Sequence, residues 1–88
     1  MKTELTARAA SARLGEFADG KRALGTTRYF KTGPGEYGEG DKFIGVATPP
    51  LRKTAREFAL LSLKEIDKLL ASEIHEHRSL ALVVLVEQ

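Results

Sequence analysis

Apolar residues recur along this chain at spacings of three and four, which is the period of an amphipathic helix. We expect a first helix over residues 3–17 and a second over residues 20–31, where Asp19 can act as the N-cap. A third helix is expected over residues 49–60. The inward positions are Leu5, Ala9, Ala12, Leu14 and Phe17 in the first helix, Ala23, Leu24, Thr27 and Phe30 in the second, and Leu51, Ala55, Phe58 and Ala59 in the third.

A fourth helix begins after Ser62, which has the capping-box spacing with Glu65. In this motif the Ser hydroxyl and the Glu carboxylate each accept a hydrogen bond from a backbone N–H at the helix start. Only a residue or two separates this helix from the third, as in an antiparallel helical hairpin. The apolar residues expected to face the core are Leu63, Ile66, Leu69 and Leu70.

The last helix starts near Ile74 and contains LALVVLV, residues 80–86, which is apolar on all sides. A helix of this kind must be covered on several sides, yet the sequence ends two residues later. We therefore expect a fragment of a longer protein. In isolation, this fragment should associate with itself through the apolar helix or fold only marginally.

Residues 32–46 hold five of the eight glycines together with Pro34, a composition typical of a loop. The loop contains a literal GxGxxG from Gly33 to Gly38. A dinucleotide-binding motif follows a strand and opens a helix, whereas here a helix precedes it, so we reject a nucleotide site. The side chains expected to pin the loop to the core are Tyr37, Phe43 and Ile44.

The start of the third helix carries the clearest candidate chemistry. We expect Thr48 to be its N-cap and Pro49 its first residue. Arg52 and Arg56 are four apart and share a face, with Lys53 beside them. Free N–H groups, the positive end of the helix dipole and these cations together favour a phosphate. The alternative is a solvated basic helix without a ligand.

The charge distribution points to the same region. The formal net charge is only +2, but residues 21–56 carry eight basic against three acidic groups, a net of +5. Residues 57–88 carry three basic against six acidic groups. A localised basic region is typical of nucleic-acid-binding domains, although scaffolding domains show similar imbalances.

Composition argues against disulfides, metal sites and membrane-spanning segments. The absence of Cys excludes disulfides and Cys-based metal sites. His75 and His77 are two apart and point to different sides of a helix, and Glu73 with His77 makes only two ligands, so no metal or other cofactor is expected. No apolar run reaches the roughly 20 residues of a membrane span, and no signal peptide is visible, so we expect a cytoplasmic protein without a membrane partner.

Several motifs together resemble one family. YFKTGPGEYGEGDKFIGV at residues 29–46, a Pro followed by LRK, SLKEID and IHEHR are similar to the DNA alkylation repair glycosylases built from HEAT-like helical repeats. The likeness covers residues 29 to about 86, the first part of a family member. It implies an all-α fold of about five helices in a right-handed stack of antiparallel helical pairs, an α–α superhelix. No internal repeat is detectable, so a plain five-helix bundle stays open.

The family resemblance also implies a function. Members hold duplex DNA on a concave basic surface and remove N3- and N7-alkylated purines. The start of the third helix faces the DNA in the family, which makes Thr48, Arg52 and Arg56 backbone contacts, with Lys53 as a further candidate. Tyr29 matches a tyrosine near the DNA, or packs under the loop instead.

The family's catalytic carboxylate and tryptophans lie beyond the part that this chain resembles, and the chain contains no Trp. We therefore assign no catalytic residue and expect residues 1–88 to be a single N-terminal fragment of a longer solenoid that binds duplex DNA weakly. The alternative is a helical-repeat module for protein–protein interaction without DNA activity. Salt dependence separates the two, because phosphate binding weakens steeply with salt.

Overall fold

The computed structural model describes residues 4–23 and 42–88, and the regular structure within these ranges is helical. This confirms the predicted all-α class. A further helix begins at Gly20, and an isolated parallel bridge joins Lys42 to Ile74. The complete helices in the described ranges are α1 (Ala7–Gly15), α3 (Thr48–Glu57), α4 (Leu63–Leu70) and α5 (His75–Glu87).

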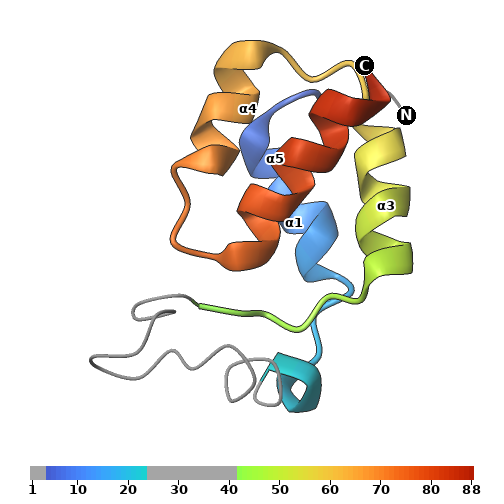
Figure 1. Ribbon diagram of the computed structural model, residues 1–88, viewed down its shortest axis with the longest axis vertical. Coiled ribbons are helices and arrows are strands. Elements are labelled where there is room, and N and C mark those ends of the chain that lie inside the picture. The colour runs from blue at the N-terminus through green and yellow to red at the C-terminus, as the bar shows by residue number, and fades with distance from the viewer. Residues whose placement is uncertain (1–3, 24–41) are drawn as a thin grey trace.

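The four helices enclose a common core (Figure 1). α5 packs against both α3 and α4, and α1 packs against the same two helices. α3 and α5 run in the same direction and α4 runs in the opposite one, as the colours in Figure 1 show. The stacking of such pairs into a superhelix stays a prediction. The largest fully buried apolar side chains are Leu14, Leu61, Ile66, Leu69, Leu80 and Val84.

Two helix starts are capped by the side chains that the sequence predicts. The Asp19 carboxylate accepts hydrogen bonds from the N–H groups of Lys21 and Arg22 at 2.9 and 3.3 Å. The Ser62 hydroxyl accepts from the N–H of Glu65 at 3.3 Å. Both side chains therefore satisfy amides that have no partner within their own helix.

The second half of the predicted capping box is wrong. The Glu65 carboxylate accepts a hydrogen bond at 2.9 Å from the N–H of Ala7, the first residue of α1. A helix start leaves its first amides without an intrahelical partner, so a carboxylate on a neighbouring helix can serve α1 instead of its own helix. At the same start, the Thr6 hydroxyl accepts from the N–H of Ala9 at 3.0 Å. Glu65 thereby joins α4 to α1.

The start of α3 also differs from the prediction. Ala47 is the N-cap and makes no side-chain capping hydrogen bond, and Thr48 is the first helical residue. A capping side chain normally accepts from the second or third helical amide, and here those positions are Pro49 and Pro50, which have no N–H. The N–H of Leu51 already bonds to the Ala47 carbonyl at 3.2 Å. The two prolines thus remove the need for a cap.

The buried faces are partly shifted from those expected. In α4, Ile66 and Leu69 are buried, but Leu63 is 68% exposed and Leu70 is 36% exposed. These two leucines are seven residues apart, so they share an edge of α4. In α1 the buried residues are Ala7, Ala10 and Leu14, whereas Ala12 is exposed. Leu5 lies before the start of α1 and is also exposed. In α3, Leu51, Ala55 and Phe58 are buried as predicted, Ala59 only in part.

The apolar segment of α5 has one covered face. Leu80, Ala81 and Val84 are fully buried against the neighbouring helices. On the outer face, Leu82 is 56% and Val86 83% exposed. Self-association through this face stays a prediction. None of the helices in the described ranges is both long enough and apolar enough to cross a membrane.

Candidate nucleic-acid interface

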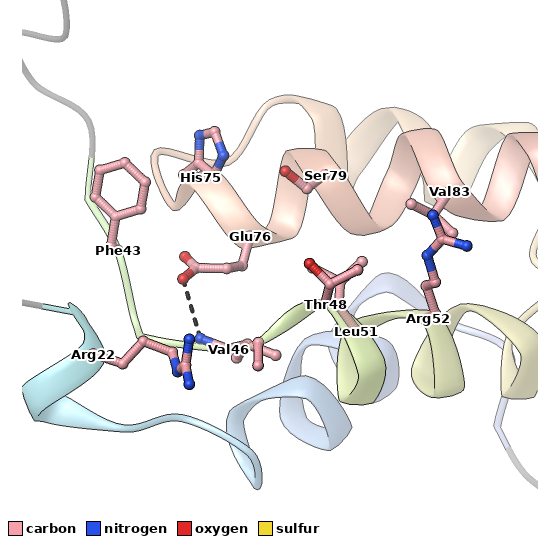
Figure 2. A pocket seen from close by; sticks show the side chains of 11 residues that line it. Arg22, Phe43, Val46, Thr48, Leu51, Arg52, His75, Glu76, Ser79 and Val83 are labelled. Carbon is pink, nitrogen blue, oxygen red and sulfur yellow. Dashed lines mark hydrogen bonds between the residues drawn. The ribbon is translucent and has the colours of Figure 1, made fainter. Parts of the chain in front are cut away.

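A hollow of about 340 Å³ lies between the start of α3 and the first half of α5 (Figure 2). The extended segment 43–47 closes one side of it. Two guanidinium groups, two hydroxyls and an imidazole contribute to its lining, beside a floor of apolar side chains. The polar lining residues are Arg22, Thr48, Arg52, His75, Glu76 and Ser79.

Two of the predicted DNA-binding residues meet at this hollow. Thr48 and Arg52 are one helical turn apart and both line it from α3. Arg56 follows one turn later on the same stripe and is exposed, outside the hollow. Lys53 is also exposed but lies toward Glu57, the residue that joins α3 to α1. Tyr29 lies outside the described residues.

Glu57 pairs with Arg13 of α1, and this pair marks the side of α3 on which Lys53 lies, away from the hollow. The Glu57 carboxylate accepts two hydrogen bonds from the Arg13 guanidinium, at 2.9 and 3.2 Å. These bonds, and secondarily the charges of Arg13 and Lys53, hold the pKa of Glu57 below its ordinary value. Lys53 therefore faces an acidic neighbour on the α1 side of α3, whereas Arg52 faces α5.

The backbone at the start of α3 offers fewer free N–H groups for a phosphate than the sequence predicts. The sequence predicts that several free N–H groups of the first turn help to bind a phosphate. Pro49 and Pro50 have none, and the N–H of Leu51 is bonded within the helix. Only the N–H of Thr48 remains among the helical amides of this turn. An anion here would be held mainly by side chains.

Glu76 is a residue of this site that the sequence reasoning missed. It is only 4% exposed. Its carboxylate accepts hydrogen bonds from three consecutive amides, those of Ile44 at 3.1 Å, Gly45 at 2.9 Å and Val46 at 3.3 Å. A signal was available, because Glu76 precedes the buried Leu80 and Val84 by four and eight residues and so lies on the inward stripe of α5.

The same segment touches the start of the helix that carries Arg22. The carbonyl of Ile44 accepts a hydrogen bond from the N–H of Asp19 at 3.0 Å. Gly45 has φ of +80°, and a Cβ there would lie 1.9 Å from the Asp19 carbonyl oxygen and 2.8 Å from the Ala23 nitrogen. Only glycine fits this approach. The sequence reasoning did not place Arg22 at the site, because this contact joins segments far apart in the chain.

His75 and Ser79 line the hollow from α5, one turn apart. The His75 ring lies against Phe43 with ring centroids 4.8 Å apart, and the backbone N–H of His75 donates to the backbone carbonyl of Lys42 at 2.8 Å. Phe43 and Ile44 are thus partly buried against the helices, as predicted, whereas Tyr37 lies outside the described residues.

The second histidine has a different environment. His77 forms a 2.9 Å hydrogen bond through Nδ1 with the Ser72 hydroxyl. Burial lowers its pKa, and the charge of Glu76 offsets this in part. Within residues 4–23 and 42–88, no three His, Cys, Asp or Glu side chains are grouped as metal ligands.

A smaller hollow of about 210 Å³ adjoins the first. It is mostly apolar, and Arg52 borders both. Its other lining residues are Leu82, Val83, Val86 and Glu87.

Comparison with known proteins identifies the family. The family described as "DNA alkylation repair enzyme" matches residues 10–88. No curated protein and no solved structure gives a match. The family match covers most of the chain, includes the residues that form the hollow, and agrees with the resemblance carried by the sequence motifs. This chain therefore belongs to the DNA alkylation repair enzyme family, and its role is in DNA alkylation repair.

Proposed function

We propose that this chain holds duplex DNA by its sugar-phosphate backbone, as the N-terminal DNA-holding part of a glycosylase that excises N3- and N7-alkylated purines. The observation that carries the proposal is the alignment of Thr48, Arg52 and Arg56 along one stripe of α3, beside a hollow with a second arginine. Guanidinium and hydroxyl groups are the usual partners of phosphate oxygens in DNA complexes.

The charges around the hollow favour an anion. The guanidinium groups of Arg22 and Arg52 line the hollow, together with the carboxylate of Glu76. The carboxylate of Glu76 is directed at three backbone amides and is almost fully buried. The hydroxyls of Thr48 and Ser79 add neutral donors. The guanidinium and hydroxyl groups of the lining therefore favour an anion.

The number of contacts limits the affinity. Thr48, Arg52 and Arg56 supply about two or three phosphate contacts, against six to ten for a strong non-specific binder. We expect the isolated chain to bind at or beyond the ~10⁻⁴ M end of non-specific affinities, without sequence preference. Such binding suits a surface that positions DNA for chemistry performed by other residues.

Excision itself requires little from this part of the protein. An N3- or N7-alkylated purine is cationic and already a good leaving group, so the main requirement is a carboxylate that stabilises the oxocarbenium-like sugar, with aromatic rings beside it. The carboxylates of Glu57, Glu65 and Glu76 are engaged by Arg13, by the Ala7 amide and by the 44–46 amides. We propose no catalytic role for them.

A second candidate function is a protein–protein interaction module. The exposed Leu82 and Val86 beside the apolar hollow favour it. Apolar association is insensitive to salt, whereas binding to phosphates weakens as salt rises. The two functions are therefore distinguished by whether binding weakens as salt rises.

Fluorescence anisotropy of a labelled mixed-sequence duplex, measured over a range of salt concentrations, tests the DNA proposal. We expect the double variant Arg52→Ala/Arg56→Ala to lose most of the binding and to flatten the salt slope by about two, since each lost phosphate contact removes about one. Arg8→Ala/Lys64→Ala is the matched control, because it removes two exposed cations from α1 and α4.

The control should weaken binding only slightly, since Arg8 and Lys64 lie outside the α3 stripe. Equal losses in the two double variants would show that any surface cations suffice. Binding that ignores both salt and the Arg52→Ala/Arg56→Ala change would exclude α3 as the DNA-facing helix.

A further inference from the structure

The carboxylate of Glu76 occupies a site that the backbone has built for an anion. Three consecutive amides, those of residues 44–46, point at it, with Gly45 in the left-handed conformation between them. Concavities of successive N–H groups of this kind bind phosphates and other anions in many proteins. Here the Glu76 carboxylate of the same chain occupies the concavity in place of a bound anion. Its hydrogen bonds therefore fix the backbone conformation and path of residues 44–46.

That path sets one side of the hollow. Gly45 lies so close to the Asp19 carbonyl and the Ala23 nitrogen that no larger residue fits, and Ile44 accepts the Asp19 N–H. Asp19 caps the turn that includes Arg22. The position of the Arg22 backbone relative to α5 thus depends on the segment that Glu76 holds.

The same path sets the other side. Val46, the last of the three amides bound by Glu76, is followed by Ala47, the N-cap of α3, and then by Thr48. Figure 2 shows Arg22 and Glu76 toward one end of the hollow, with Thr48 and then Arg52 further along α3. One buried carboxylate therefore holds the segment that connects to both elements that carry the arginines.

We propose that Glu76 is a positioning residue for DNA binding: by holding the amides of residues 44–46, it sets Arg22 and the Thr48–Arg52 stripe at the spacing needed to grip one stretch of phosphate backbone. This inference rests on the proposed function of the hollow. It assigns a role in DNA binding to Glu76, although its carboxylate has the same charge as the phosphates and need not contact the DNA.

Because Glu76 is negatively charged, the proposal can be tested by whether Glu76→Gln strengthens or weakens DNA binding. Removing a negative charge near a DNA-binding surface should strengthen binding if charge alone matters. Glu76→Gln removes that charge with little change of shape, but its side-chain NH₂ is a donor and would face amides that are also donors. If Glu76 positions the site, this variant binds DNA more weakly although its charge is more favourable.

Glu73→Gln is the matched control. Glu73 lies three residues earlier and is exposed, and its carboxylate forms an exposed ion pair with Lys42 at 3.0 Å. We expect Glu73→Gln to bind the labelled duplex as well as the wild type or slightly better. Glu76→Gln should bind about tenfold more weakly and have a salt slope lower by about one, as for the loss of at least one phosphate contact.

Amide hydrogen exchange followed by NMR shows whether the change is local. In Glu76→Gln we expect faster exchange at Ile44, Gly45 and Val46, with protection in α1 and α4 retained. Gly45→Ala disturbs the same segment from the opposite side and leaves Glu76 in place, so it should reproduce the loss of DNA binding.

Three results would overturn the proposal. One is duplex binding by Glu76→Gln that equals or exceeds that of Glu73→Gln. Another is unchanged exchange at residues 44–46. The third is loss of protection throughout α1 and α4, which would make Glu76 a residue of the core. If Arg52→Ala/Arg56→Ala also binds normally, the proposed function fails; if only Glu76→Gln does, the positioning role alone fails.

Discussion

The carboxylate of Glu65 in α4 accepts a hydrogen bond at 2.9 Å from the backbone N–H of Ala7, which is 58 residues away in the sequence. Glu65 also pairs with Lys68 at 2.9 Å. The Ala7 amide, followed by Lys68, holds the pKa of Glu65 below its ordinary value. Glu65, which the sequence predicts to cap its own helix, therefore joins α1 to α4.

This hydrogen bond predicts a pH dependence of stability. Because the pKa of Glu65 is lower in the folded protein than in the unfolded chain, its stabilising effect is fully present above the ordinary carboxyl pKa and is lost as the pH falls through the folded value. We expect urea unfolding from about pH 7 to about pH 3 to show a smaller acid loss for Glu65→Gln than for the wild type.

Glu73→Gln serves as the control for this titration, because Glu73 is exposed and its ion pair with Lys42 is exposed as well. Its acid loss should match that of the wild type. If Glu65→Gln and Glu73→Gln have the same pH profile, the hydrogen bond to Ala7 does not contribute to stability.

The two faces of α5 predict different costs for one chemical change. Leu80 is fully buried and Leu82 is 56% exposed. Leu80→Ala should lower the free energy of unfolding by about 2–5 kcal/mol, the range for a leucine removed from a packed core. Leu82→Ala should change it by no more than about 0.5 kcal/mol. Chemical denaturation measures both, and equal costs would contradict the packing of α5.

The outer face of α5 predicts weak self-association. Leu82, Leu85 and Val86 are exposed together on this helix, and burying them against a second copy would remove apolar surface from water. Sedimentation equilibrium should show association that rises with protein concentration, changes little with salt, and is lost in Leu82→Lys/Val86→Lys. A concentration-independent monomer would contradict this prediction and weaken the protein-interaction alternative.

The assignment of excision to other residues predicts an inactive isolated chain. Incubated with duplex DNA that contains a 7-alkylguanine, the 88-residue chain should release no base above the spontaneous rate. The binding-deficient Arg52→Ala/Arg56→Ala variant should give the same rate. Chromatography of the released base measures it, and enzyme-dependent release by the wild type would place a catalytic group within these residues.

Local signals in the sequence were sufficient for helix positions and for part of the site. The hydroxyl of Ser62 and the carboxylate of Asp19 act on amides within three residues of themselves, so their capping roles could be predicted. The spacing of Thr48 and Arg52 likewise fixed their common face. The family was identified because the motif from residue 29 to 46 is long and unusual in composition.

Contacts between distant segments could not be predicted in the same way. Glu65 could have turned to its own helix or to Ala7, and only the packing of α1 on α4 decides between them. The burial of Glu76 was visible in its spacing from Leu80, but its partners were not, because the three amides belong to an irregular segment about 30 residues earlier. The same holds for Arg22, which reaches the hollow through the close approach of Gly45.

The two prolines at the start of α3 bear on how this protein would travel on DNA. Because they remove rigid amide donors, the proposed binding of a phosphate by α3 would depend on long, flexible arginine side chains. Such side chains can exchange one phosphate for the next without leaving the duplex, and charge-based binding of this kind lets proteins slide and hop. If α3 binds DNA as proposed, its loose hold would therefore suit one-dimensional search, in which a repair protein passes over many undamaged base pairs before it meets a rare lesion.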